Sequence, residues 1–153
     1  MPYLLRLRGV LDVGALQHSL QTLVQRHESL RTTFTSLADQ LLQVVIPTFP
    51  LPLTVRDLRT RPATARVAEA QALLQEASER PLTMAQGPLF ALDLVHIDDQ
   101  EHYVLFTVHH SISDGWSLGV LVRELVLLYT AYVTAQPVQL PALPVQYIDV
   151  AAW

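Results

Sequence analysis

The chain has 153 residues, half of them apolar, and a formal net charge of −4. A chain of this length can bury about 70% of the surface that its unfolded form exposes, so we expect one folded domain and no extended disorder. The sequence contains no cysteine, which excludes disulfides, thiol nucleophiles and thiolate metal sites, and it has no basic cluster of the kind that binds nucleic acid. No apolar run has the length of a membrane span, and the first residues do not form a signal-peptide pattern. We therefore expect a cytoplasmic protein without a membrane partner.

Hydrophobic periodicity and turn residues divide the chain into strands and helices. Asp12 is a good N-cap for the first helix, and the second helix ends before Pro81. In chain order the expected elements are a strand at 3–8, a helix at about 12–29, a hairpin of strands at 31–35 and 41–46, a short strand at 53–55, a helix at 62–79, strands at 88–97 and 102–110, and a helix at about 115–134.

The last two elements carry most of the apolar side chains. The strand at 102–110 is apolar on both faces, which predicts a central strand. The helix at 115–134 is apolar almost all round, with Val126 and Leu127 opposite its main apolar face, which predicts burial on more than one side. The order of the elements predicts an α+β fold, a two-layer sandwich in which a mixed, largely antiparallel sheet carries helices on one face.

The most informative stretch is His109-His110-Ser111-Ile112-Ser113-Asp114-Gly115-Trp116-Ser117. A histidine held at a strand end can move protons near neutral pH. Adjacent strand residues point to opposite faces, so His109 and His110 cannot easily share one task, and His110 is nearer the loop and the cleft. Two roles stay open for Asp114, a catalytic carboxylate and a structural anchor, and the anchor is favoured because an aspartate at a helix start readily caps the helix or pairs with an arginine. Gly115 has no side chain, so its backbone can approach a ligand closely.

Two simpler interpretations of this stretch stay open. Histidines are often ordinary core or rim residues, and paired histidines can bind a metal. The spacing H-H-x-x-x-D-G between a strand and a helix favours a functional site over the first interpretation. A metal site is disfavoured because the two histidines diverge and no third ligand is evident. The spacing itself is rare enough to narrow the function to acyl transfer.

Three stretches resemble signatures of the condensation domains of nonribosomal peptide synthetases. The stretch from His109 to Ser117 resembles the third signature, Arg26-His27-Glu28-Ser29-Leu30-Arg31-Thr32-Thr33-Phe34 the second, and Tyr147-Ile148-Asp149-Val150-Ala151-Ala152-Trp153 the fourth. The run Asp-Gly-Trp-Ser after the histidines resembles the class that joins two L-configured residues. The match is to the N-terminal lobe alone, at 1–136, with 137–153 as a linker and the start of a crossover to a second lobe.

This resemblance implies a fold similar to chloramphenicol acetyltransferase and a reaction that forms an amide bond. The amine of a downstream aminoacyl thioester attacks an upstream acyl thioester. Both substrates are bound as thioesters to the phosphopantetheine arms of carrier proteins. It implies no cofactor bound directly to the chain. The expected partners are upstream and downstream carrier proteins, the C-terminal lobe of the same domain and an adjacent adenylation domain.

The resemblance also implies roles for individual residues. His110 is the catalytic residue, and Asp114 supports the site by pairing with an arginine of the second signature, Arg31 in preference to Arg26. The further assignments are structural support by His109 and a substrate channel lined by Gly115, Trp116 and Ser117.

Three functions stay open from the sequence. The leading one is a catalytic lobe that is inactive on its own. The second is a non-catalytic module that docks carrier proteins, against which an intact His110 argues. The third is a self-sufficient acyltransferase that oligomerises, so that a neighbouring chain completes its site.

Overall fold

The computed structural model describes residues 1–138 and 140–153, except for the side chains of Ala151 and Ala152. The chain divides into two compact units. The first comprises residues 1–11, 52–82 and 90–109, and the second comprises residues 12–51, 83–89 and 110–153. The boundary between the units falls inside the histidine motif, so that His109 belongs to the first unit and His110 to the second.

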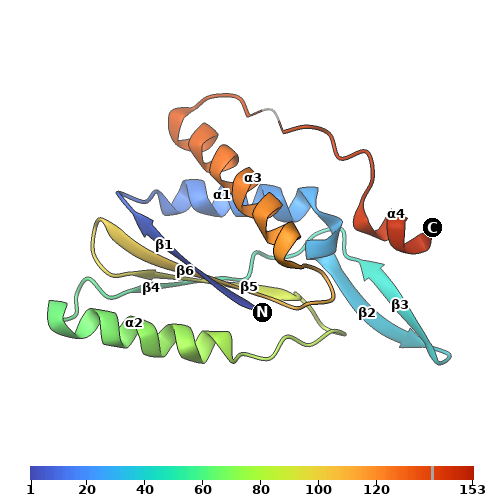
Figure 1. The fold of residues 1–153 in the computed structure, drawn as a ribbon, viewed down its shortest axis with the longest axis horizontal. Coiled ribbons are helices and arrows are strands. Elements are labelled where there is room, and N and C mark those ends of the chain that lie inside the picture. Colours follow the sequence, from blue (N-terminus) through green and yellow to red (C-terminus); the bar gives the residue numbers. More distant parts are fainter. Residues whose placement is uncertain (139) are drawn as a thin grey trace. The chain divides into compact units, whose positions relative to one another are not determined.

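The first unit contains a four-stranded sheet and one helix (Figure 1). Its elements are β1 (Pro2–Arg8), β4 (Leu53–Asp57), α2 (Ala63–Ser78), β5 (Phe90–His96) and β6 (Glu101–Val108). The strand order is β1-β6-β5-β4, in which β1 and β5 are antiparallel to β6 and β4 is parallel to β5. The expected α+β class and the mixed, largely antiparallel sheet are confirmed, and β6 is a central strand as predicted.

Helix α2 covers one face of this sheet because both surfaces carry apolar residues at the matching period (Figure 1). On the helix these residues recur every three or four positions, and on the strands they alternate with a period of two. The cluster consists of Leu58, Ala70, Leu74, Ala77, Val95, Ile97 and Leu105. Burying one large aliphatic side chain of this kind stabilises the folded chain by roughly 1.5–3 kcal/mol.

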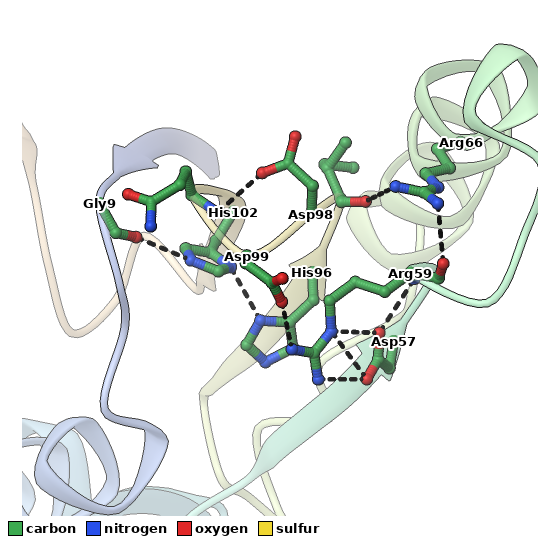
Figure 2. A network of polar contacts seen from close by, with 10 residues as sticks. Gly9, Asp57, Arg59, Arg66, His96, Asp98, Asp99 and His102 are labelled. Atoms are coloured by element: carbon green, nitrogen blue, oxygen red, sulfur yellow. Dashed lines mark hydrogen bonds and ion pairs between the residues drawn. The ribbon is translucent and has the colours of Figure 1, made fainter.

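A pair of histidines lies at one end of the two central strands, β5 and β6 (Figure 2). His96 on β5 and His102 on β6 face each other across the ladder, with 2.8 Å between their Nδ1 atoms. The Nε2 atom of His102 lies 3.1 Å from the carbonyl oxygen of Gly9, which can only accept, so Nε2 carries the hydrogen. The Nδ1 atom of His102 is then free to accept a hydrogen bond from Nδ1 of His96. The buried pair is therefore complete when both rings are neutral.

Three charged side chains, Asp57, Arg59 and Asp99, lie near His96 (Figure 2). Arg59 binds Asp57 at 2.7 Å and Asp99 at 2.8 Å, and its hydrogen bonds hold the pKa of the Asp57 carboxyl well below its usual range (Figure 2). Burial is the largest cause that lowers the pKa of His96, the nearby charges of His102 and Arg59 lower it further, and the Asp57 carboxylate opposes them. Protonation of His96 is thus opposed above all by its burial.

We expect acidification below pH 6.5 to destabilise this unit through His96. Because the pKa of His96 is lower in the folded chain, the unfolded chain binds a proton more readily, and stability is full above the ordinary value of 6.5 and declines as the pH falls below it. Thermal denaturation between pH 7.5 and 5.5 measures this, and His96→Leu should flatten the profile. The exposed His18 provides a control, because His18→Gln should leave the slope unchanged. An equal slope in wild type and His96→Leu would show that another group is responsible.

The second unit contains α1 (Val13–Arg26), the 3-10 turn η1 (Glu28–Arg31), the hairpin strands β2 (Thr32–Leu37) and β3 (Gln40–Val45), α3 (Gly115–Thr134) and α4 (Tyr147–Ala152). Asp12 caps α1 as predicted, accepting a hydrogen bond from the backbone of Ala15 at 2.9 Å. The hairpin is also confirmed, but it forms a separate two-stranded sheet. Its turn places Ala38 and Asp39 at φ values of 49° and 63°, the geometry of a tight hairpin turn.

Helices α1 and α3 lie side by side in this unit (Figure 1). Two tyrosines of α3 reach across to α1. Tyr129 accepts a hydrogen bond from the backbone of Asp12 at 2.9 Å, and Tyr132 contacts Thr22 and stacks on His18. The buried residues are Ala15, Leu16, Ser19, Leu20, Leu23 and Val24 on α1 and Leu121, Glu124 and Leu128 on α3.

The predicted burial of α3 on more than one side is wrong. Its bounds agree with the prediction, but Val126 and Leu127 are 58% and 48% exposed, because the neighbouring α1 contacts only one side of it. Among the described residues, α3 is also the one helix that is long and apolar enough to cross a bilayer, with a mean hydropathy of 1.4. Length and composition alone are weak evidence for a membrane span, since the core helices of soluble proteins meet the same criterion.

The segment at 137–153 contains one element that the sequence patterns did not predict, the six-residue helix α4. Gln146 caps it, with its backbone N–H bonded to the Asp149 carboxylate at 2.8 Å. Residue 139 of the predicted linker lies outside the described residues.

Candidate functional site

The two motif histidines lie just beyond β6 and not on it. The strand ends at Val108, two residues earlier than predicted, and His110 already belongs to the turn that leads to α3. The expected alternation of His109 and His110 on opposite faces of a strand therefore does not apply. His109 is half-buried and His110 is exposed.

The His110 ring is held by the backbone of its own loop. Its Nδ1 atom lies 3.2 Å from the carbonyl oxygen of Ser113, and because a carbonyl only accepts, Nδ1 carries the hydrogen. In the neutral ring this leaves Nε2 with its lone pair, and that form can take a proton or accept a hydrogen bond. An acceptor three residues after the donor in the same loop thus fixes both the tautomer and the ring orientation.

His110 lines a cavity of about 260 Å³ in the second unit. The other lining residues are Ser29, Ser111, Ile112, Ser113, Asp114, Ser117 and Tyr147. Three of the predicted site residues, His110, Asp114 and Ser117, therefore line the same cavity. Most of the remaining walls carry hydroxyl groups, so a polar reacting group can be accommodated beside the imidazole.

Asp114 is the N-cap of α3. Its Oδ1 atom accepts hydrogen bonds from the backbone N–H and the hydroxyl of Ser117, at 2.8 and 2.7 Å. These two bonds, the backbone one first, hold the pKa of the Asp114 carboxyl below its usual value. A carboxylate at a helix N-terminus is also favoured by the helix dipole. The anchoring role that the sequence suggested is thus carried out by capping.

The expected ion pair between Asp114 and Arg31 is not present among the described residues. Arg31 is only 8% exposed, and its guanidinium donates to four backbone carbonyls, those of Val24 at 3.0 Å, Gln25 at 3.2 Å, Ile46 at 2.7 Å and Pro47 at 3.3 Å. The first two belong to the last turn of α1, whose carbonyls have no partner within the helix. The charge of Arg31 is therefore satisfied by backbone dipoles.

Arg26, the alternative partner, does not pair with Asp114 either. Its guanidinium forms two hydrogen bonds with the Glu124 carboxylate on α3, at 3.1 and 3.4 Å. The exposed Asp114 is hydrogen-bonded to Ser117, and both arginines of the second signature have partners elsewhere in the unit.

The predicted channel residues separate in the structure. Ser117 lines the His110 cavity, whereas Gly115 and Trp116 do not, and Trp116 is 84% exposed. Residue patterns missed Ser29 and Tyr147 as lining residues, although both lie within the second and fourth signature stretches. They also missed Glu124, the one acidic residue of α3. Among the described residues, no cluster of three or more histidines and carboxylates is arranged to hold a metal ion.

We expect Gly115→Ala to fold at least as stably as the wild type. Gly115 is the first residue of α3, and a Cβ atom added to it would meet nothing within 4 Å. Replacing glycine by alanine at a compatible helical position stabilises by roughly 0.4–1 kcal/mol. Chemical denaturation of Gly115→Ala and Gly115→Leu measures this. A strong loss of stability in both would mean that the backbone needs glycine, whereas stable proteins with graded loss of activity in the complete domain indicate a channel.

Known proteins resemble the chain over its full length. The model of the condensation domain family matches residues 1–153. One of the proteins that make up linear gramicidin synthase in Brevibacillus parabrevis is 42% identical over 153 residues, which cover all of this chain and 2% of that protein. Chondramide synthase cmdD from Chondromyces crocatus is 40% identical, and the match covers 4% of it. The chain thus spans only a small part of these relatives.

Solved structures agree with this match. The X-domain from teicoplanin biosynthesis aligns with the whole chain at a TM-score of 0.87 and 30% identity, and the chain covers 32% of that structure. The SgcC5 protein from Streptomyces globisporus aligns at a TM-score of 0.83 and 30% identity, with 34% of it covered. Since the family model spans every residue from the first to the last, the chain belongs to the condensation domain family.

Proposed function

We propose that this chain supplies the catalytic histidine of a nonribosomal peptide synthetase condensation domain. In the reaction, the amine of a downstream aminoacyl thioester attacks the carbonyl carbon of an upstream acyl thioester. A C–N bond forms, the C–S bond breaks, the amine loses one proton and the departing thiol gains one. The observation that carries the proposal is the bond from His110 Nδ1 to the Ser113 carbonyl, which leaves Nε2 able to accept a proton.

His110 can serve this reaction in two ways. As a general base it takes the proton from the attacking amine, and as a hydrogen-bonding group it stabilises the tetrahedral intermediate. General base catalysis typically contributes about 10²–10⁴ in rate. Both roles need an imidazole of fixed orientation, which the loop between His110 and Ser113 provides.

The substrates are carried to this site and are not held by it along their whole length. A cavity of about 260 Å³ is smaller than most small-molecule sites, which measure roughly 300–1,000 Å³. It suits the reacting thioester and amine, while the phosphopantetheine arms and their carrier proteins lie outside it. Carrier-bound substrates and an adjacent adenylation domain belong to the same proposal, which is supported by the match to the condensation domain family and to proteins named as synthases.

The chain alone is expected to make no amide bond. Orientation of two reactants can lower a barrier by roughly 7–11 kcal/mol, and that requires walls on every side of the substrates. His110 is exposed here, and the chain covers about a third of the solved structures it resembles. We therefore assign the missing walls to the C-terminal lobe of the same domain.

Donor- and acceptor-loaded carrier proteins provide the test. They are presented to the complete domain, to this chain alone, and to this chain with the remainder of the domain added in trans. Product is expected in the first and third mixtures only. Turnover by the chain alone would contradict the proposal, and turnover confined to an oligomer of it would favour a self-sufficient acyltransferase. Donors loaded with L or D residues test the L-to-L class, which predicts a strong preference for the L donor.

A second candidate function is the docking of a partner without catalysis. It is favoured by one observation, that the X-domain from teicoplanin biosynthesis, 30% identical to this chain, has been solved in a complex with OxyB. This function predicts that His110→Ala leaves the activity of the assembled synthetase unchanged while the binding of carrier proteins persists. The catalytic proposal predicts the opposite result for activity.

A further inference from the structure

Glu124 is a buried carboxylate in the middle of the apolar helix α3. Glu124 is 5% exposed and lies one helical turn from each of the buried residues Leu121 and Leu128. An unpaired charge in such a place destabilises a fold by several kcal/mol, so its partners have to compensate for lost water. Burial raises the pKa of Glu124, but hydrogen bonds from His27 and Arg26 outweigh it and bring the pKa below the usual value.

Both carboxylate oxygens of Glu124 are bound by the end of α1. Arg26, the last residue of that helix, donates through Nε to Oε2 at 3.1 Å and through Nη2 to Oε1 at 3.4 Å. His27, the residue that caps the helix, lies with Nε2 at 2.7 Å from Oε2. Because these residues immediately precede η1, Glu124 fixes the direction in which the chain leaves α1 toward Ser29.

The same residues hold the segment that leads into α4. The Arg26 guanidinium also donates to the carbonyl of Pro141, and the Arg26 carbonyl accepts from Nε2 of Gln146 at 3.0 Å. The side-chain oxygen of Gln146 accepts from the backbone N–H of Glu28 at 3.2 Å. Gln146 is the N-cap of α4, so this network ends one residue before Tyr147.

Ser29 and Tyr147 are two of the walls of the His110 cavity. One comes from η1 and the other from α4, and neither belongs to the loop that carries His110. From these contacts we infer that Glu124 is a positioning residue of the condensation site. Through Arg26 and His27 it holds the end of α1, and through Arg26 it joins that end to the segment 140–147, which sets the places of Ser29 and Tyr147 beside His110.

Hydrogen exchange of the chain itself tests the network without reference to any reaction. Glu124→Gln keeps the size of the side chain but removes its charge and one of its acceptors. Exchange in residues 26–31 and 140–149 should become about 10- to 100-fold faster, the factor expected for losing hydrogen bonds to a charged group. Glu76→Gln makes the same chemical change at an exposed position of α2 and should leave both segments unchanged. Unchanged exchange in Glu124→Gln would overturn the inference.

The kinetic arm rests on the proposed function and uses the complete condensation domain with loaded carrier proteins. A misplacement of about 1 Å can slow a reaction 10²-fold, so we expect Glu124→Gln to slow amide formation by up to about that factor. Gln146→Ala should slow it too, and the double variant should be no slower than the worse single one. Additive losses, or a wild-type rate in Glu124→Gln, would contradict a positioning role. A wild-type rate in His110→Ala would contradict the proposed function instead, and the exchange result would still stand.

Discussion

Replacing His110 by alanine in the complete condensation domain is expected to slow amide formation by about 10²–10⁴ and to leave the melting temperature unchanged. On the proposed function the rate falls because the variant loses the nitrogen to which we assign uptake of the amine proton or binding of the intermediate. The fold persists because the ring is exposed and its hydrogen bond is to the carbonyl of Ser113 within the same loop. Single-turnover product formation, followed by mass spectrometry, measures the effect.

Two further variants sharpen this result. His110→Gln can form a hydrogen bond but is not a base near neutral pH, so a rate close to that of the wild type would identify stabilisation of the intermediate as the contribution of His110. His18→Ala removes an exposed histidine from α1 and should retain full activity. A near-wild-type rate in His110→Ala itself would remove this residue from the reaction.

Replacing Arg31 by alanine is expected to destabilise the chain by about 3 kcal/mol or more. Four backbone carbonyls lose their donor; the bond to Val24 is buried and the other three are partly buried, and a buried acceptor left without a partner costs about 1–3 kcal/mol, less where water can enter. Arg31→Lys should recover only part of the loss, because an ammonium lacks the planar fork that reaches several acceptors at once. Urea denaturation measures the free energy of unfolding, and Arg123→Ala, at an exposed position of α3, is the control.

Asp114→Ala should reduce stability by a smaller amount than Arg31→Ala. Asp114 is exposed and loses only its two bonds to Ser117. Because Asp114 and Arg31 have separate hydrogen-bond partners, the effects of the two substitutions should add in the double variant. Equal single losses together with a double variant no worse than either would restore the ion pair that the family resemblance implied.

Sequence patterns were sufficient where a local signal determines the structure. Asp12 and Asp114 precede apolar residues at helical spacing, and both cap a helix where predicted. The bounds of α3 follow from such signals. The short α4 was missed because six residues after a proline-rich stretch carry too little periodicity to distinguish a helix from a turn.

The partners of charged residues were not predictable in this way. The acceptors of Arg31 are backbone carbonyls. Because every residue has one, the residue types in the sequence do not indicate which carbonyls will accept. A clue to Glu124 was available, since a single acidic residue stood between Leu121 and Leu128 on the apolar face of a helix. Such a residue requires a buried cation, and Arg26 and His27 were the nearest candidates in the second signature.

The acceptor that holds His110 is a main-chain atom, and this determines which changes the motif can tolerate. Any residue type at position 113 offers the same carbonyl, so substitutions at 111–113 should preserve the imidazole tautomer as long as the turn is kept. Inserting or deleting a single residue there would move the carbonyl out of reach. Evolution at this loop should therefore be strict in length, while its composition is limited by the burial of Ile112 and Ser113, at 6% and 7% exposure, and not by the hydrogen bond to His110.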